Sequence, residues 1–472
     1  MNNKHLMDYS VSQTERTYKI AGDLELHVTM TSNPHHLPLD ALFIMAARIN
    51  KKRSFLFVSK VLGKHIPVNP YTSLLSGTVL ALLLHKALQG TQLDHKVASA
   101  IEGLIDPEKA EGAYLAIMSE RLELKQPVAF IGFAETATAI GHAVYEAFGQ
   151  GSRYLHTTRE VIEESPTILQ FEEEHSHAVA HYGYSDDPAL LAEPEILVLV
   201  DDEITTGQTS INIIRDLQGK YPKKIYYVLA LLDWRTADNR AQFALLEQEL
   251  NVEIHVISLI QGATKVVGSS ESLSTREHSS TPEVTPSGRV QISYVDGLFD
   301  HAPYAGERPY LLHSGRFGLT STSSKELDYS ISQAATGLKR MRKGTSTLCV
   351  GSGEFMYIPM RIAAEMGAGV SYQSTTRSPI HVIDREDYAV RSGDSFPSPE
   401  DEQVTHFFYN IPYGEYQEIF LFIEREASPA AMAPILRILQ RRGLESLHLV
   451  FFSPQTVDWK EAEVWKLGER NQ

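Results

Sequence analysis

One stretch of the chain, EILVLVDDEITTGQTS at residues 195–210, constrains the fold more than any other. After Glu195 come five consecutive apolar residues at 196–200 and then two adjacent carboxylates, Asp201 and Asp202. An apolar run without polar alternation is typical of a strand buried on both faces, and therefore of a parallel sheet covered by helices. The residues after this strand are expected at the carboxyl edge of the sheet, where such folds bind ligands.

The loop after the two carboxylates has the composition of an anion site. It combines hydroxyl groups with one permissive glycine in Thr205, Thr206, Gly207, Gln208 and Thr209. Successive backbone N–H groups of such a loop converge on one phosphate at the N-terminus of the helix predicted to begin near Ser210. Ionised Asp201 and Asp202 only accept hydrogen bonds, so they suit the hydroxyls of a sugar attached to that phosphate. The pattern predicts a ribose 5-phosphate site; the alternative is a turn whose Asp and Thr residues cap the helix.

LVLVDDEITTGQT resembles the phosphoribosyl diphosphate (PRPP) signature of type I phosphoribosyltransferases, which has four apolar residues, two acids and a Thr-Thr-Gly loop. Glu203 departs from it, standing where the family usually has an apolar residue. The resemblance implies a pentosyltransferase that moves ribose 5-phosphate from PRPP to a small nitrogenous base, or runs the reverse reaction. It implies Mg²⁺ as cofactor, without a separate metal site built from protein ligands. The alternative is a non-catalytic regulator that senses PRPP or a nucleotide on the same fold.

Two further segments are expected to bind pyrophosphate. A short apolar strand at 127–131 precedes a Gly-led turn and a helix, whose N-terminus leaves N–H groups free. The resemblance makes Ala134, Glu135 and Thr136 of this turn the pyrophosphate loop. Arg159 lies where the orotate enzyme has an Arg-Lys-Glu signature, and its guanidinium suits pyrophosphate; the alternative is a surface salt bridge.

An N-terminal hood is the last expected part of the site. Residues 39–49 have the spacing of a helix, and an aromatic strand near 53–58 leads into a loop with Lys60, Lys64 and His65. The loop either faces an anion or forms a solvated surface. Lys60 is the closest match to the hood lysine of orotate phosphoribosyltransferase. Asp201, Asp202, Arg159 and Lys60 are therefore the expected catalytic residues.

Residues 163–187 resemble by position the mobile catalytic loop of the family. That loop is basic in relatives but acidic here. His175 and His177 within it form either a metal or proton-transfer pair or two solvated side chains, and the role of this loop stays open.

The composition limits the partners. A chain of 472 residues has room for two or three domains, and its net charge of -16 opposes nonspecific binding to nucleic acid or anionic lipid. The single cysteine, Cys349, excludes an intramolecular disulfide framework and fits a reducing compartment. Without an apolar N-terminal segment or an uninterrupted apolar run of membrane-spanning length, we expect a cytoplasmic protein.

The second part of the chain repeats the first. Residues 268–289 are rich in Ser, Thr, Gly and Pro and predict a linker between domains at 1–267 and 290–472. EIFLFI at 418–423 corresponds to EILVLV, and YQSTTRSPI at 372–380 corresponds to YLHTTREVI at 154–162. The turn 351–354 matches 132–135, and YLLHSGRFG at 310–318 matches the hood. The predicted fold class is α/β, with two tandem type I phosphoribosyltransferase-like domains of Rossmann type.

The second copy is predicted to be degenerate. Glu424 and Arg425 replace the acid pair, and Pro429 removes an N–H donor from the phosphate loop. Its TRSP string, at Thr376 to Pro379, resembles a module that follows an orotate-like phosphoribosyltransferase in bacterial proteins encoded beside tellurium-resistance genes. That resemblance implies biosynthesis of a nucleotide-like metabolite. We expect either a homodimer or an intramolecular pseudo-dimer in which Arg377 serves the first site.

Overall fold

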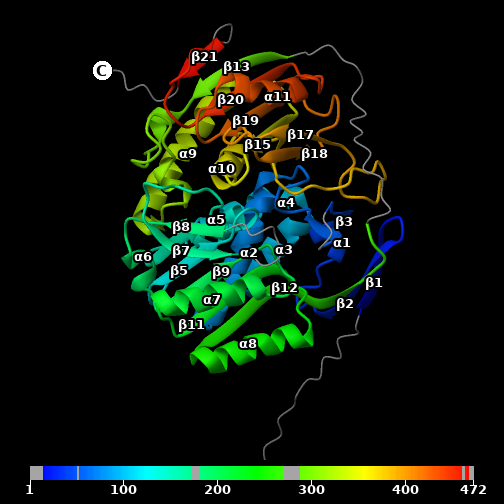
Figure 1. Ribbon diagram of the computed structural model, residues 1–472, viewed down its shortest axis with the longest axis vertical. Coiled ribbons are helices and arrows are strands. Elements are labelled where there is room, and N and C mark those ends of the chain that lie inside the picture. Colours follow the sequence, from blue (N-terminus) through cyan, green and yellow to red (C-terminus); the bar gives the residue numbers. More distant parts are fainter. Residues whose placement is uncertain (1–13, 50–52, 173–179, 271–287, 460–462, 467–472) are drawn as a thin grey trace, which may run out of the picture.

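The structure is a computed structural model that describes residues 14–49, 53–172, 180–270, 288–459 and 463–466. The described chain forms two α/β halves, each built around its own sheet, with helix α10 (Tyr357–Glu365) among the helices between the two sheets (Figure 1). Most of the predicted linker, and His175 and His177, lie outside the described residues.

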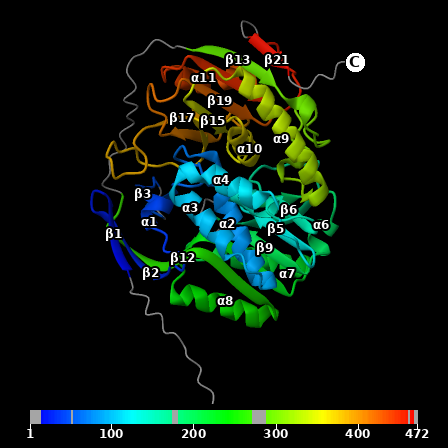
Figure 2. The ribbon, with the colours of Figure 1, turned by 180° about the vertical axis from the view of Figure 1, so that it is seen from behind.

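The first sheet has a core of five parallel strands in the spatial order β6, β5, β9, β11, β12. These strands are β5 (Val128–Gly132), β6 (Ser152–His156), β9 (Ile196–Val200), β11 (Ile225–Asp233) and β12 (Glu253–Val267). The chain runs outward from β5 to β6 and then returns to β9 on the other side of β5. Right-handed crossovers therefore place α5 (Ala137–Glu146) on one face and α7 (Gln208–Lys220) and α8 (Ala237–Leu250) on the other, as Figures 1 and 2 show.

The second sheet repeats this order as β16, β15, β19, β20, and all four strands are parallel. They are β15 (Thr347–Gly351), β16 (Val370–Ser374), β19 (Glu418–Ile423) and β20 (Ser446–Phe451), with α11 (Pro429–Gln440) between the last two. The next position is filled by β13 (Arg289–Tyr294), which precedes the other strands in sequence, and then by β21 (Glu463–Lys466). The prediction of two tandem α/β domains of one topology is confirmed.

Equivalent hydrogen bonds support the sequence repeat. In each half, the hydroxyl of a threonine that follows the second strand accepts a hydrogen bond from a backbone N–H of the turn after the first strand. A tyrosine on the second strand donates its hydroxyl to a backbone carbonyl. A second tyrosine, on a β-hairpin, accepts a hydrogen bond from a backbone N–H. The pairs are Ala134–Thr157 (2.9 Å) and Gly353–Thr375 (2.8 Å), Tyr154–Thr138 (2.6 Å) and Tyr372–Met356 (2.9 Å), and Ile162–Tyr184 and Ile380–Tyr409 (both 2.9 Å).

A β-hairpin missing from the sequence comparison also recurs. It consists of β7 (Thr167–Glu172) and β8 (Ala180–Tyr184) in the first half and of β17 (Gly393–Pro397) and β18 (Thr405–Tyr409) in the second.

The two halves exchange their hood segments, which are residues 43–49 and 53–68 in the first half and 310–320 in the second. Val68 pairs with Tyr372 of β16, while β14 (Leu319–Thr320) pairs antiparallel with β6. The backbone of Gly63 accepts a hydrogen bond from Ser374 at 2.8 Å, and that of Gly315 accepts one from His156 at 3.0 Å. Each hood therefore packs on the sheet of the other half.

Helices α2 (Pro70–Gln89) and α9 (Ser321–Met341) follow the two hoods. Among the described residues, α2 alone has the length and apolarity to cross a membrane, but 72% of its most apolar window is buried inside the structure. It contacts α5 and α10, so it belongs to a core shared by the two halves.

The prediction of a helix over residues 39–49 is mostly wrong. The helix ends at Leu42, and residues 43–47 pair as a strand with the aromatic strand that follows.

The remaining elements are β1 (Thr14–Ala21), β2 (Leu24–Ser32), α1 (Leu39–Leu42), β3 (Phe43–Ala47), β4 (Phe55–Ser59), α3 (Asp94–Ile105), α4 (Pro107–Met118), α6 (Ala189–Ala192), β10 (Glu203–Ile204), and the 3₁₀ turns η1 (Asp296–Leu298) and η2 (Leu312–Ser314).

Candidate active site

A cavity of about 550 Å³ opens at the carboxyl ends of β5, β9 and β11, beneath the β3–β4 hairpin of the hood. Its position follows from the strand order, because the crossovers from β5 and β9 leave in opposite directions and create a crevice between them. The lining includes residues of both halves: Arg48, Arg53, Phe55, Leu56, 133–137, Arg159, 201–210, Trp234, Thr236, Asn239, Thr264 and 376–378.

The acid pair is held by the sheet at the mouth of this cavity. All five residues of β9 are buried, which explains the unbroken apolar run. Beyond it, the Asp201 N–H donates to the carbonyl of Leu229, and the Asp202 carbonyl accepts from Leu231. Because the backbone is fixed by β11, both carboxylates line the cavity.

The predicted phosphate loop wraps the N-terminus of α7, which begins at Gln208. Gly207 precedes the helix with φ of 78°, in the left-handed region that favours glycine. A Cβ at Gly207 would lie 2.4 Å from the ring of Phe243, so a side chain has no room there. The five loop residues 205–209 line the cavity. The N–H of Gln208 donates to the Thr206 hydroxyl at 3.3 Å, and the N-cap residue Gly207 offers no side chain to the N–H groups that follow, which can therefore meet an anion.

The second predicted loop, 134–136, lines the same cavity. Glu135 is 8% exposed and forms an ion pair of 2.5 Å with Lys64, and Arg159 lies 4.0 Å from its other oxygen. Burial alone would raise the pKa of Glu135, but Lys64 and Arg159 more than offset it and lower the pKa to about 2. The Ala134–Glu135 peptide bond is cis.

Arg159 is oriented by the second half of the chain. Glu354 of that half accepts a hydrogen bond from the hydroxyl of Thr158 at 2.5 Å and from the backbone N–H of Arg159 at 3.0 Å. Arg377, also from the second half, lines the cavity with Thr376 and Ser378. The structure thus brings Arg159 and Arg377, predicted from the two copies of one repeat, to one cavity.

Lys60 lies elsewhere, contrary to expectation. It is exposed, its ammonium donates to the backbone carbonyl of Asp40 at 2.8 Å, and it is not among the described residues that line the cavity. Lys64 of the same loop is the buried cation, and it joins Glu135 to the carbonyl of Gly353 in the second half. The sequence marked this basic loop but carried no signal for which lysine points inward.

Three charged residues of the cavity were not predicted as site residues. Arg48 directly follows β3 and Arg53 precedes β4, and Glu203, noted only as a departure from the family, forms an ion pair with Arg53. The sequence marked Glu203 as a departure from the family but carried no signal for which distant cation pairs with it.

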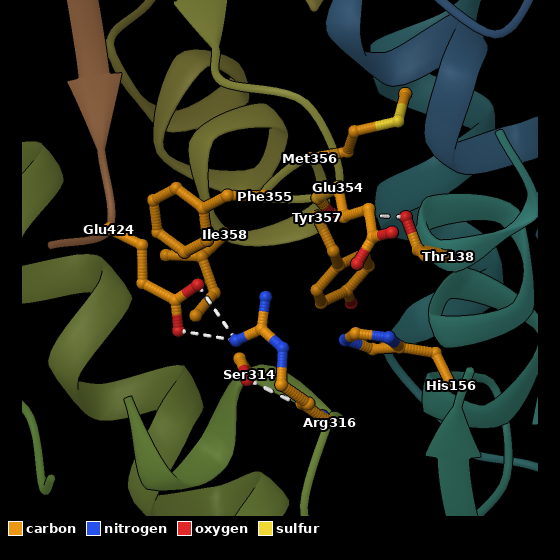
Figure 3. Close-up of a pocket in the computed structure, with 10 residues that line it drawn as sticks. All are labelled: Thr138, His156, Ser314, Arg316, Glu354, Phe355, Met356, Tyr357, Ile358 and Glu424. Carbon is orange, nitrogen blue, oxygen red and sulfur yellow. Dashed lines mark hydrogen bonds and ion pairs between the residues drawn. The ribbon is translucent and has the colours of Figure 1, made fainter. Parts of the chain in front are cut away.

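The equivalent position in the second half is filled by side chains. Arg316 of the second hood donates to both oxygens of Glu424 at 2.8 Å (Figure 3). The Leu311 N–H also donates to Glu424, at 3.1 Å. The Arg425 guanidinium lies 4.1 Å from the ring centre of Tyr310 and 3.5 Å from Glu160. Only about 10 Å³ remains open beside Arg316 and Glu424. Glu424, which corresponds to Asp201, therefore pairs with Arg316, a cation of the protein itself.

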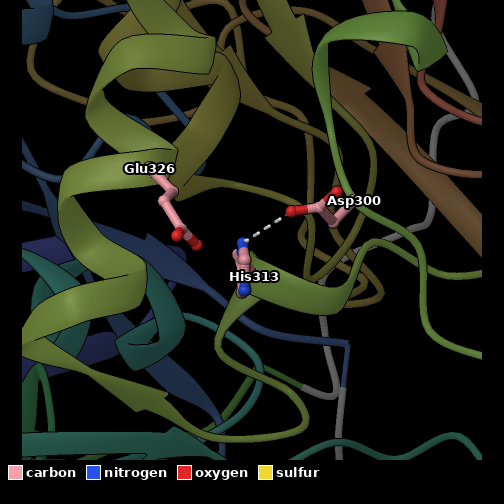
Figure 4. A group of neighbouring side chains, drawn as sticks. All are labelled: Asp300, His313 and Glu326. Carbon is pink, nitrogen blue, oxygen red and sulfur yellow. Dashed lines mark ion pairs between the residues drawn. The ribbon is translucent and has the colours of Figure 1, made fainter.

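Asp300, His313 and Glu326 form a separate group near the second hood (Figure 4). Their potential ligand atoms lie within 4.8 Å of one another, but the Asp300 side chain is 70% exposed and His313 is 3.9 Å from it. Exposed acids often gather in this way without binding an ion, so this group does not alter the expectation that the metal accompanies the substrate.

Comparison with known proteins agrees with this geometry. Residues 42–263 match the family described as phosphoribosyl transferase, and residues 313–439 match the family described as the TRSP domain C-terminal to it. The chain carries a phosphoribosyl transferase domain followed by a TRSP domain. The cavity lies at the ends of transferase-domain strands, and Thr376, Arg377 and Ser378 reach it from the TRSP domain.

Several solved structures are similar to parts of this chain. Adenine phosphoribosyl transferase from Trypanosoma brucei, in complex with AMP, pyrophosphate and ribose-5-phosphate, is 9% identical, with 49% of this chain and 82% of that chain covered and a TM-score of 0.30. The enzyme from Thermoanaerobacter pseudethanolicus is 18% identical, with coverage of 34% and 86% and a TM-score of 0.23. The enzyme from Leishmania donovani is 9% identical, with coverage of 47% and 77% and a TM-score of 0.26. No curated protein matches the chain.

Proposed function

We propose that the transferase domain moves ribose 5-phosphate between pyrophosphate and a small nitrogenous base. The observation that carries the proposal is the single cavity that unites the acid pair, the loop 205–209, the loop 134–136 and two arginines. A structural turn would explain one of these features but not their convergence.

Each group has a role that follows from its chemistry. The N–H groups at the start of α7 bind the 5-phosphate, and Asp201 and Asp202 accept hydrogen bonds from the ribose hydroxyls. The same carboxylates stabilise the positive charge that grows on the ribose as the bond to pyrophosphate breaks. Arg159 and the loop 134–136 receive the leaving pyrophosphate. The domain therefore acts by positioning the substrate and stabilising charge.

The donor set also fits Mg²⁺. Asp201 and Asp202 offer carboxylate oxygens at an open cavity, and Mg²⁺ prefers oxygen ligands, usually one or two carboxylates together with substrate phosphates. Mg²⁺ bound with the diphosphate would neutralise charge on the leaving group. Asp201 and Asp202 would hold it beside the ribose.

The acid pair provides the decisive test. We expect Asp201→Asn with Asp202→Asn to lower pyrophosphate release from PRPP by at least about 100-fold, because charge stabilisation in the transition state is lost. Circular dichroism and thermal unfolding should stay unchanged, since both side chains face the cavity. Asp384→Asn, which removes an exposed ion pair with Arg391, is the control. Full activity in the double variant would refute the assignment. PRPP binding without turnover for any base in the wild type would favour the regulatory alternative.

We propose that the TRSP domain is a built-in partner for this site. The exchanged hoods and the shared α2, α5 and α10 core resemble a dimer within one chain, and Arg377 brings a second cation to the cavity. We expect Arg377→Ala to weaken PRPP binding by about 10-fold, as the loss of one charge-assisted contact implies. Exposed Arg437→Ala on α11 is the control, and unchanged PRPP affinity and turnover for Arg377→Ala would remove this role.

A further inference from the structure

An ion pair crosses one end of the cavity. Arg53, just before β4 of the hood, donates to Glu203, the first residue of β10, and its guanidinium carbon lies 5.2 Å from the ring centre of Phe55. The ring and the carboxylate together fix the plane of the guanidinium. Both partners line the cavity, and the Glu203 side chain is only 11% exposed.

Each member of the pair has one buried polar atom that remains unpaired. Arg53 Nε and Glu203 Oε2 are buried and have no hydrogen-bond partner within the part of the chain that the structure describes. Burying unpaired polar atoms is unfavourable, so such atoms beside an open cavity are expected to meet a ligand. A ligand that satisfies both must present an acceptor next to a donor.

The place of the pair identifies which part of the substrate it meets. Asp201 and Asp202 are assigned to the ribose, and residues 205–209 to the 5-phosphate. The hood end, with Arg48, Arg53, Phe55 and Glu203, is the part of the lining left for the nitrogenous base. An aromatic ring beside polar atoms suits a planar heterocycle.

A second guanidinium, that of Arg48, helps to decide which hydrogen-bonding edge of a base fits this end of the cavity. It lines the same end of the cavity, and its charge acts on Glu203 together with that of Arg53. A carbonyl oxygen has two lone pairs and can accept from two guanidinium groups, whereas a ring nitrogen has only one lone pair. Two cations with one carboxylate therefore favour a carbonyl beside an N–H over a ring nitrogen beside an amino group.

We propose that the base is an oxo-substituted heterocycle whose lactam edge binds here, with its carbonyl toward Arg48 and Arg53 and its N–H toward Glu203. This inference rests on the proposed phosphoribosyl transfer, because it places ribose and phosphate in the rest of the cavity. It gives a function to the residue at which the PRPP signature of this chain departs from that of its relatives.

Isothermal titration of the full chain with nucleoside monophosphates tests the proposal. IMP and AMP are one matched pair of probes and UMP and CMP another, because each pair differs at the lactam edge. We expect IMP to bind at least about 10-fold more tightly than AMP, and UMP more tightly than CMP, because the wrong edge leaves buried groups unpaired. Arg53→Met and Glu203→Ile should each reduce this preference, while Arg215→Met, which removes an exposed ion pair with Glu249, should preserve it.

The wild-type comparison decides the question even if a variant fails to fold. Ribose 5-phosphate, titrated separately, reports the sugar-phosphate site alone. If ribose 5-phosphate binds while AMP and CMP bind as tightly as their oxo partners or more tightly, the lactam proposal is overturned and the proposed function stands. If neither ribose 5-phosphate nor any nucleotide binds, the proposed function fails and the inference fails with it.

Discussion

Among single residues, Gly207 has the backbone conformation on which the loop 205–209 most depends. Its φ of 78°, and the 2.4 Å that would separate a Cβ at this position from the ring of Phe243, leave no substitution without strain. We expect Gly207→Ala to cost about 1–2 kcal/mol in local strain and to raise the dissociation constant for PRPP at least about 10-fold, measured by calorimetry.

Gly219 offers a matched control within the same helix. A Cβ at Gly219 would meet no atom within 4 Å, so Gly219→Ala should leave PRPP affinity unchanged and raise stability by up to about 1 kcal/mol. Equal affinities for PRPP in the two variants would contradict the assignment of the loop to the phosphate.

The residues around this loop show how far sequence alone reaches. Asp201, Asp202 and the loop 205–209 could be placed together because an apolar strand, two acids and a Gly-containing turn are contiguous. Lys64 and Arg53 could not, since a cation's burial depends on an acid distant in sequence: Glu135 for Lys64 and Glu203 for Arg53. Local pattern predicts a residue's environment only when its partners are also local.

At the scale of elements, the loop that carries Arg159 depends on a residue of the TRSP domain. Glu354 holds both the Thr158 hydroxyl and the Arg159 N–H, so it positions the loop from about 200 residues away in sequence. We expect Glu354→Gln to lower kcat/KM for PRPP by about 10-fold, because an uncharged amide has one acceptor oxygen and cannot accept both bonds, with little change in thermal unfolding.

A double-mutant cycle separates positioning from general damage. If Glu354 acts through Arg159, then Glu354→Gln should have little further effect in an Arg159→Ala background. Glu365→Gln, at the C-terminal end of α10, is the control. Fully additive effects of the two substitutions on kcat/KM would contradict the positioning role.

Secondary structure was predicted correctly for the regular elements. It was predicted incorrectly where pairing with a neighbouring strand determines the conformation. The buried strands β9 and β19 have unbroken apolar sequences, and the structure confirms them. Residues 43–47 have helical spacing, yet they pair with β4, and the hood hairpin packs Phe43 against the ring of Trp234. Helical periodicity over such a short apolar run does not exclude a strand, and pairing with a neighbour determined the outcome.

At the scale of the whole molecule, the first half has an open site and the second a filled one. The two equivalent hood cations, Lys64 and Arg316, pair with different acids. Lys64 pairs with Glu135 of the loop 134–136, and Asp201 and Asp202 line an open cavity. Arg316, at the corresponding hood position, pairs instead with Glu424, which corresponds to Asp201. The duplication thus kept the fold and the exchanged hoods while the second site became part of the contact between halves.

Buried histidines at and near that contact, among them His65, His156 and His406, make folding sensitive to acid. His65 and His156 lie on or beside the exchanged hoods, and His406 lies on β18. Burial lowers the pKa of each below 6.5, and the positive charges of Lys64 beside His65 and Arg316 beside His156 act in the same direction; the resulting pKa is about 3 for His65 and His156 and about 4 for His406. All three are therefore neutral in the folded protein at pH 5, whereas the unfolded chain protonates them.

The sign of the pH effect follows from this difference. The three histidines leave stability unaffected above pH 6.5, and below it the unfolded state binds protons that the folded state does not. Each should lower the free energy of unfolding by about 2 kcal/mol at pH 5. Urea unfolding at pH 7 and pH 5, followed by tryptophan fluorescence, measures the loss. His65→Phe should reduce this loss by about 2 kcal/mol, because a phenyl ring binds no proton in the unfolded chain, with the exposed His255→Gln as the control. Equal stability of the wild type at the two pH values would show that these side chains reach solvent.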